Sequence, residues 1–258
     1  MKLQPVAVAL FACLASCATT EAPAPVSALA SAPSAVPESV PAPVVNSAVV
    51  AAPRTDPWIL ERQAECLRRV RETERANVIF LGDSITQGWE GGGSEHWTRA
   101  FAPLGALNLG VSGDRTENVL WRLEQAPLGK LQPQAIVLLI GTNNLGHGTH
   151  TGEQTLAGIQ RVIATLRTQV PAARLFVLEV FPRGERFNAM RGELAQLNQA
   201  LRARQAELGC ETLALGDRWV QLDGSISTSD MPDHLHLSPA AYGQWADALE
   251  PVLRAALR

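Results

Sequence analysis

Four short polar blocks in this sequence together supply the groups that acyl transfer requires. Gly82-Asp83-Ser84 offers a serine hydroxyl as nucleophile. His236 offers a base, and Asp233 offers a carboxylate to orient that base. The three-residue offset lets both of these side chains lie on one side of a single turn. The sequence therefore predicts Ser84 as the nucleophile, His236 as the general base and Asp233 as the group that fixes the tautomer of His236.

Attack on an ester carbonyl also needs hydrogen-bond donors for the negative oxygen that forms. The blocks Asn108–Asp114 and Gly141–Asn144 each contain a residue that suits this role. A glycine at position 113 lets the backbone approach a substrate closely, and Asn143 carries a neutral amide that does not titrate. The predicted oxyanion donors are the backbone N–H groups of Ser84 and Gly113 and the side-chain amide of Asn143.

Each block also has a simpler interpretation. Gly113-Asp114 could be an ordinary turn, and Asn143-Asn144 could be a loop after a buried strand. His234 and His236 could form a metal pair, but no cysteine, glutamate or third histidine is spaced to complete a zinc site, so no metal is predicted. The catalytic interpretation depends on the conjunction of all four blocks, in order, at predicted strand ends or in loops.

The elements that must position these blocks alternate between strand and helix. Continuous apolar runs, typical of buried parallel strands, are separated by segments with helical spacing. The predicted strands are Val78–Leu81, Ala106–Leu109, Ala135–Ile140, Leu175–Val180 and Thr212–Leu215, and the predicted helices are Trp58–Arg75, Glu95–Ala102, Thr116–Gln125, Gln154–Gln169, Asn188–Leu208 and Pro239–Leu257. This order predicts a three-layer α/β domain, with a five-stranded parallel sheet flanked by helices and a site at the carboxyl ends of the strands.

Other reactive side chains of the folded part receive no catalytic role. Cys66 and Cys210 could form a disulfide or remain buried thiols, because neither lies in a Cys-x-x-Cys or metal-like spacing. His147 and His150 lie in a glycine-rich loop and are expected to face solvent; a place at the rim of the site is the alternative.

The first 55 residues are predicted to target and tether the domain. An apolar run from Val6 to Ala15 is shorter than the roughly 20 residues needed to span a bilayer, and Leu14-Ala15-Ser16-Cys17 resembles the lipobox of bacterial lipoproteins. Residues 1–17 are therefore predicted to be a lipoprotein-type signal peptide with lipidation at Cys17; an ordinary cleaved signal peptide is the alternative. Residues 18–55, rich in Ala and Pro, are predicted to be a disordered tether, and residues 56–258 the folded domain.

These features predict an exported, membrane-anchored lipoprotein that faces the periplasm or the cell surface. The net charge of -3 and the isoelectric point near 6.0 provide no basic field for nucleic acid. The expected partners are a small-molecule, glycan or lipid ester and, through Cys17, a membrane.

The order of the four blocks resembles that of the SGNH (GDSL-type) hydrolases, which are named for Ser, Gly, Asn and His. The resemblance runs from about Asn77 to Tyr242 and implies a flavodoxin-like fold with no metal or organic cofactor. The residues that match the family positions for nucleophile, oxyanion donors and Asp-x-x-His are Ser84, Gly113, Asn143, Asp233 and His236.

Within that family, the chain is most similar to the catalytic subunits of intracellular platelet-activating-factor acetylhydrolase. The stretches that carry this similarity are Pro103–Asp114, Asn118–Leu123, Phe181–Glu185 and Asp223–Ser227. Those enzymes are dimers that remove an acetyl group from a phospholipid-like ester, so the resemblance implies a possible homodimer. The exported character of this chain and its different loop at Trp89–Gly93 mean that the substrate does not carry over.

The sequence therefore predicts a serine esterase that hydrolyses carboxylic esters through an acyl-serine intermediate. Short acyl groups such as acetate, on a glycan, lipid or small alcohol, are the first choice, and a lysophospholipid or longer-chain ester is the alternative. A non-catalytic surface-tethered binding lipoprotein is a third hypothesis, but such a protein would be expected to have lost one of its catalytic residues. The sequence leaves open the acyl length, the alcohol, inner versus outer membrane and the oligomeric state.

Overall fold

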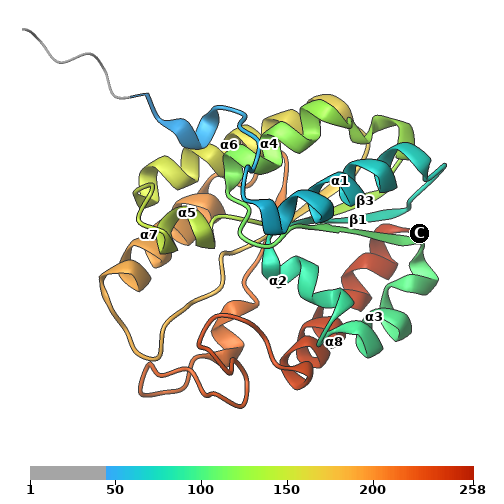
Figure 1. Ribbon diagram of the computed structural model, residues 1–258. Helices are drawn as coiled ribbons and strands as arrows, with labels where there is room; N and C mark the ends of the chain where they lie inside the picture. Colours follow the sequence, from blue (N-terminus) through green and yellow to red (C-terminus); the bar gives the residue numbers. More distant parts are fainter. Residues whose placement is uncertain (1–44) are drawn as a thin grey trace, which may run out of the picture. The chain divides into compact units, whose positions relative to one another are not determined.

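The computed structural model describes residues 45–258 of the chain (Figure 1). The predicted signal peptide, its lipidation site Cys17 and most of the predicted tether lie outside the described residues. Within the described range, none of the helices combines the length and the apolar character that crossing a bilayer requires.

A parallel sheet of five strands lies at the centre of the domain, in the order β2-β1-β3-β4-β5. The strands are β1 (Val78–Gly82), β2 (Ala106–Gly110), β3 (Ala135–Leu139), β4 (Arg174–Leu178) and β5 (Glu211–Leu213). Every residue of β1 and β3 is buried, which explains the continuous apolar runs in their sequences. The predicted five-stranded parallel sheet is confirmed.

Helices cover both faces of this sheet and complete the three layers (Figure 1). The α-helices are α1 (Pro57–Glu72), α2 (Ser84–Gln87), α3 (Ser94–Ala100), α4 (Thr116–Gln125), α5 (Thr142–Gly146), α6 (Gly152–Gln169), α7 (Ala189–Ala203) and α8 (Pro239–Ala256). Short 3-10 helices are η1 (Ser47–Val49), η2 (Gly88–Glu90), η3 (Ala102–Leu104), η4 (Leu128–Leu131) and η5 (Gly216–Trp219). Alternate strand residues divide between two apolar cores: Ile79 and Leu81 pack with α1, α4, α6 and α7, whereas Val78 and Phe80 pack with α3 and α8.

Two helices end well before their predicted ends, and one short helix was not predicted. Helix α1 ends at Glu72 and α7 at Ala203, before their predicted ends, and the chain after α7 turns through Gly209 with a φ of +63°. The segment after Ser84, whose sequence is compatible with a helix, forms the short helix α2, whereas α5 was missed because its five residues are too few to show a helical period.

The folded domain begins near Asn46, whereas the sequence predicted that it begins at Asp56. Ala48 is fully buried, its carbonyl accepts a hydrogen bond from Thr116 Oγ1 at 2.8 Å, and the carbonyl of Ala52 accepts one from Asn118 Nδ2 at 3.0 Å. Composition could not reveal this segment as folded, because its backbone carbonyls, and not large apolar side chains, hold it to α4.

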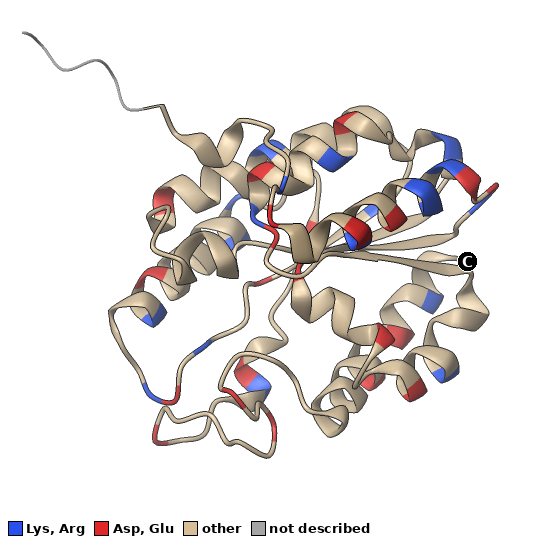
Figure 2. Ribbon diagram, in the orientation of Figure 1, with Lys and Arg blue, Asp and Glu red and all other residues tan. Residues whose placement is uncertain are grey.

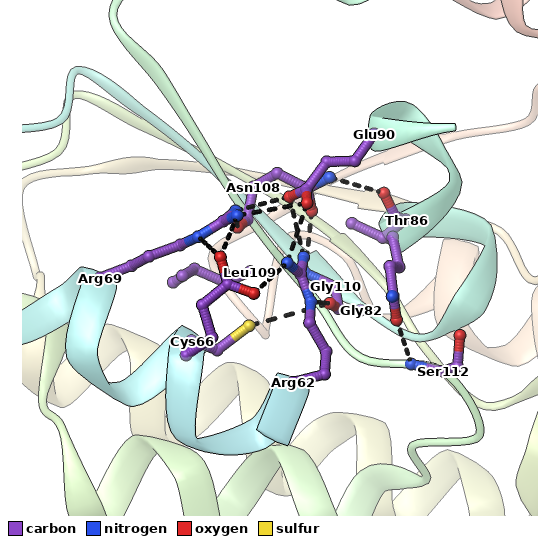
Figure 3. A network of polar contacts seen from close by, with 12 residues as sticks. Arg62, Cys66, Arg69, Gly82, Thr86, Glu90, Asn108, Leu109, Gly110 and Ser112 are labelled. Atoms are coloured by element: carbon purple, nitrogen blue, oxygen red, sulfur yellow. Dashed lines mark hydrogen bonds and ion pairs between the residues drawn. The ribbon is translucent and has the colours of Figure 1, made fainter. Parts of the chain in front are cut away.

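The free edge of β2 is covered by polar side chains of α1 (Figure 3). Arg62 Nε donates to the carbonyl of Gly110 at 3.0 Å, and Arg69 Nη1 donates to that of Asn108 at 3.2 Å. Glu90 accepts from Arg62 at 2.8 and 2.9 Å, so η2 is tied to the same edge. Acidic and basic residues are interspersed along α1 (Figure 2). These bonds satisfy edge carbonyls that would otherwise be open to another strand.

The end of β2 also positions the helix that carries Ser84. Asn108 Nδ2 donates to the carbonyl of Thr86 at 3.1 Å, and its Oδ1 accepts from Gly110 N–H at 2.9 Å. Gly110 permits this close approach, because a Cβ there would lie 2.2 Å from the backbone nitrogen of Gln87. Helix α2 is therefore fixed against β2 by backbone contact as well as by a buried amide.

Neither cysteine of the domain forms a disulfide. Cys66 is buried on α1 and Cys210 is half-buried after α7, and both are free thiols. Burial raises the pKa of both thiols above the usual value. The sequence left open either a disulfide between Cys66 and Cys210 or two free thiols, and the structure shows two free thiols.

Candidate active site

Ser84, His236 and Asp233 form a continuous hydrogen-bonded series at the carboxyl edge of the sheet. Ser84 is the first residue of α2, directly after β1, and its Oγ lies 2.9 Å from His236 Nε2. His236 Nδ1 lies 2.6 Å from Asp233 Oδ2. The structure therefore brings together the three side chains that the sequence singled out, although 152 positions separate Ser84 from His236.

Asp233 is held in the orientation and charge state that suit it to pair with a histidine. Its Oδ1 accepts the backbone N–H groups of His236 at 2.7 Å and Leu235 at 3.1 Å. Partial burial alone would raise the pKa of Asp233, but the hydrogen bonds from His236 outweigh it, and the pKa lies below its usual value. Ionised Asp233 can only accept a hydrogen bond, so it favours the tautomer of His236 with the proton on Nδ1. His236 Nε2 is then free to accept a hydrogen bond from the Ser84 hydroxyl.

Asp83 shapes the turn that presents Ser84. Its carboxylate is fully buried, and its Oδ1 accepts the backbone N–H of Ile85 at 2.9 Å as the N-cap of α2. The other oxygen has no hydrogen-bond partner among the described residues. Burial raises the pKa of Asp83 from 3.8 to about 7. Its contacts make Asp83 a structural residue of the turn that precedes Ser84.

Gly113 lies in a tight turn after β2, with a left-handed φ of +74°. The turn is held on one side by Gln87 Oε1, which accepts from Ser112 N–H at 2.8 Å. Asp114, next in sequence, is fully buried and accepts from Arg122 Nε at 2.9 Å. Burial raises the pKa of Asp114 to about 6, although Arg122 opposes the shift. A glycine is required here because a side chain rarely adopts this φ.

Asn143 lies on α5, directly after β3, and joins the two predicted oxyanion loops. Its Nδ2 donates to the carbonyl of Asp114 at 3.0 Å. A side-chain amide has two N–H groups, so this bond fixes the orientation of the amide and leaves a second donor for another acceptor. Because β1 lies between β2 and β3, the loops that carry Ser84, Gly113 and Asn143 leave adjacent strands at one edge.

The sequence model of the GDSL-like lipase/acylhydrolase family matches residues 80–244. The chain belongs to this family. Subunit alpha1 of platelet-activating factor acetylhydrolase IB from Homo sapiens is 40% identical over 177 residues, which cover 68% of this chain and 74% of that subunit. Subunit alpha2 from Gallus gallus is 38% identical over 178 residues, or 69% of this chain and 76% of the relative.

Solved structures share the fold at lower identity. A GDSL-like lipase from Bacteroides thetaiotaomicron superposes with a TM-score of 0.63 at 18% identity, covering 76% of this chain and 97% of that one. Axe2, an acetylxylan esterase from Geobacillus stearothermophilus, gives a TM-score of 0.55 at 16% identity, covering 70% and 96%. With the family membership, these neighbours identify the chain as a carboxylic ester hydrolase.

Asn144 and His150 form a buried support beneath the esterase's α5 loop that sequence reasoning missed. Asn144 is fully buried; its Oδ1 accepts from Thr116 N–H at 3.0 Å, and its Nδ2 lies 3.1 Å from His150 Nδ1. The expectation that His150 faces solvent is wrong: the ring is buried, and its Nε2 lies 2.8 Å from Ser47 Oγ. His147 is exposed, as expected. The signal for Asn144 in the sequence was the pair Asn143-Asn144. Only one of the two asparagines is needed as an oxyanion donor, so the other is available for a structural role.

Arg183 is a further residue of the site that the sequence reasoning did not single out. Its Nη1 donates to the carbonyl of Thr142 at 3.1 Å and so braces the residue before Asn143. Burial lowers the pKa of Arg183, and the charges of Asp83 and Asp233 oppose that shift. The stretch Phe181–Glu185 carries part of the family resemblance, but its residues contain no signal of a contact with α5.

Replacement of Asp83 by asparagine should flatten the pH dependence of the esterase's stability. The pKa of Asp83 is higher in the folded chain than in an unfolded one. Its contribution to the unfolding free energy is therefore full below about pH 4 and is lost as pH rises through about 7. Between pH 5 and 8 we expect the wild type to lose about 1–3 kcal/mol more unfolding free energy than Asp83→Asn. Urea titrations at each pH measure this, and parallel curves for the two proteins would show that Asp83 has no raised pKa.

Proposed function

We propose that this hydrolase is a serine esterase that acts through an acyl intermediate on Ser84. The observation that carries the proposal is the hydrogen-bonded series from Asp233 through His236 to Ser84, with separations of 2.6 and 2.9 Å. Ser84 is half-buried, and the side chains of His236 and Asp233 are 45% and 56% exposed, so an ester can reach them from solvent.

The first half of the proposed reaction transfers the acyl group to the enzyme. His236 Nε2 takes the proton of Ser84 as Oγ bonds to the ester carbonyl carbon, and the carbonyl π pair moves to oxygen. The N–H groups of Ser84 and Gly113 and the free N–H of Asn143 are the proposed donors to that oxygen. The tetrahedral intermediate collapses as the bond to the alcohol oxygen breaks, and His236 gives its proton to the leaving alcohol.

The second half releases the acid. Water bonds to the acyl carbon as His236 takes one of its protons, and the same donors hold the new oxyanion. The bond from the acyl carbon to Ser84 Oγ then breaks, and His236 returns its proton to Oγ. Ionised Asp233 stabilises the imidazolium that forms in both halves, which is why its depressed pKa suits the mechanism.

Short acyl groups are the proposed substrates, on a glycan, lipid or small alcohol. The names of several relatives support acetate: platelet-activating factor acetylhydrolase subunits, an acetylxylan esterase, and a carbohydrate acetylesterase from Sinorhizobium meliloti. A longer-chain ester is the alternative, which the GDSL-like lipase neighbour favours.

The full-length chain should hydrolyse p-nitrophenyl esters of two to twelve carbons with a maximum at acetate. Ser84→Ala should lower kcat by about 10³-fold or more, because it removes the hydroxyl proposed to form the acyl intermediate. Ser94→Ala is the matched control, since Ser94 is exposed at the start of α3 and should leave kcat unchanged.

Other outcomes of this series separate the competing hypotheses. A maximum at eight or more carbons would replace the acetyl assignment with a lipase or lysophospholipase. Turnover that survives Ser84→Ala would contradict the nucleophile. Absence of turnover at every length would favour the non-catalytic binding protein.

We also propose that a lipid on Cys17 anchors the domain to a membrane, on the periplasmic side or at the cell surface. Leu14-Ala15-Ser16-Cys17 after a short apolar run supports this, as does the distance in sequence from Cys17 to the folded domain near Asn46.

Cys17→Ala should move the protein out of the membrane fraction of a bacterial host and abolish labelling by radioactive palmitate. Cys66→Ala changes a buried thiol of the domain and should leave both unchanged. Labelling that persists in Cys17→Ala would contradict the anchor, and an unlabelled, soluble wild type would indicate an ordinary cleaved signal peptide.

A further inference from the structure

Arg54 extends from the segment before α1 to the turn that carries Gly113. Its Nη1 donates to the carbonyl of Ser112 at 3.0 Å. A Cβ on Gly113 would lie 2.6 Å from the same nitrogen, so the guanidinium packs directly on the Cα of that glycine. In the sequence, Arg54 lies within the predicted tether of residues 18–55 and belongs to none of the four polar blocks.

The position of this hydrogen bond matters because of the peptide unit it touches. The Ser112 carbonyl and the Gly113 N–H belong to one planar amide. A cation that hydrogen-bonds the carbonyl oxygen fixes the plane of that amide and draws electron density toward oxygen, which makes the N–H at the other end a stronger donor. That N–H is one of the three proposed oxyanion donors.

Arg54 is itself held in place by several groups. Its Nε donates to Asp56 Oδ2 at 2.7 Å, and its guanidinium lies 5.4 Å from the ring centroid of Trp58. Its Nη1 is 3.9 Å from Asp114 Oδ1, a buried oxygen with no hydrogen-bond partner among the described residues. Only a tenth of the Arg54 side chain is exposed. A guanidinium so restrained is a fixed charge and not a mobile surface group.

We infer that Arg54 is a positioning residue for the oxyanion, acting through the Ser112–Gly113 amide. It fixes the direction of the Gly113 N–H and strengthens that donor as negative charge develops on the substrate oxygen. This inference rests on the proposed esterase function. It makes the segment between the tether and α1 part of the catalytic apparatus.

A purely structural role for Arg54 leads to different kinetics. If the side chain only ties the segment before α1 to the domain, its loss lowers the melting temperature and the fraction of active protein, but not kcat per active site. If it strengthens an oxyanion donor, its loss lowers kcat more than it changes KM, because the donor acts mainly on the charged transition state.

The test uses the full-length chain with p-nitrophenyl acetate, and active sites are titrated with an organophosphonate. Arg54→Met should lower kcat by about 10-fold and leave KM within about twofold, which is a smaller loss than removal of a whole oxyanion donor. The rate of Ser84 phosphonylation should fall by a similar factor, because the phosphoryl oxygen needs the same donors.

Two further variants separate charge from hydrogen bonding, and a third serves as control. Arg54→Lys keeps the charge and Arg54→Gln keeps a neutral donor, so both should fall between wild type and Arg54→Met. Arg68→Met removes an exposed arginine of α1 that pairs with Glu72 at 3.7 Å, and it should keep wild-type kcat.

Wild-type kcat per titrated site in Arg54→Met or Arg54→Gln would overturn the inference, whatever the change in melting temperature. Should Arg54→Met not fold, the ranking of Arg54→Lys and Arg54→Gln below wild type still decides it. An inactive wild type would instead count against the proposed function, so the two failures are distinguishable.

Discussion

Parallel pairing of β1 with β2 on one side and β3 on the other is the constraint on which the site depends. Gly82 at the end of β1 is in register with Gly110 and with Leu139, so three successive loops leave the sheet at one level. The nucleophile loop is thereby flanked by the two loops proposed to hold the oxyanion. His236 arrives from a fourth segment, just before α8, and closes the site by its contact with Ser84.

Buried polar groups hold these loops, at a cost in stability that the two apolar cores must offset. Asp83 and Asp114 are both fully buried, and burial raises the pKa of each toward neutrality. The cost of burying the charge of Asp114 is partly offset by the nearby guanidinium groups of Arg122 and Arg54. One carboxylate oxygen of Asp83, in contrast, has no hydrogen-bond partner among the described residues. The same residues that make the loops rigid therefore make the domain sensitive to pH.

Strands and long helices were readable from the sequence because apolar runs and helical spacing extend over several residues, as in Thr116–Gln125, which matches α4 at both ends. The polar blocks were readable because few residue types perform acyl transfer. Arg54 and His150 were not, because the contact that gives each its place in the site is with a group far away in sequence, the Ser112 carbonyl for Arg54 and Ser47 Oγ for His150. Tertiary contacts of this kind leave no local period or composition to detect.

Mass spectrometry of a trapped acyl-enzyme tests the central claim most directly. The full-length protein would be mixed with p-nitrophenyl acetate, quenched in acid within the first turnover, digested and sequenced by fragmentation. An acetyl group on Ser84, lost again when quenching is delayed until the substrate is consumed, is the expected result. Ester hydrolysis with no acetyl on Ser84 at any quench time, or with acetyl on another side chain, would contradict the acyl-serine mechanism.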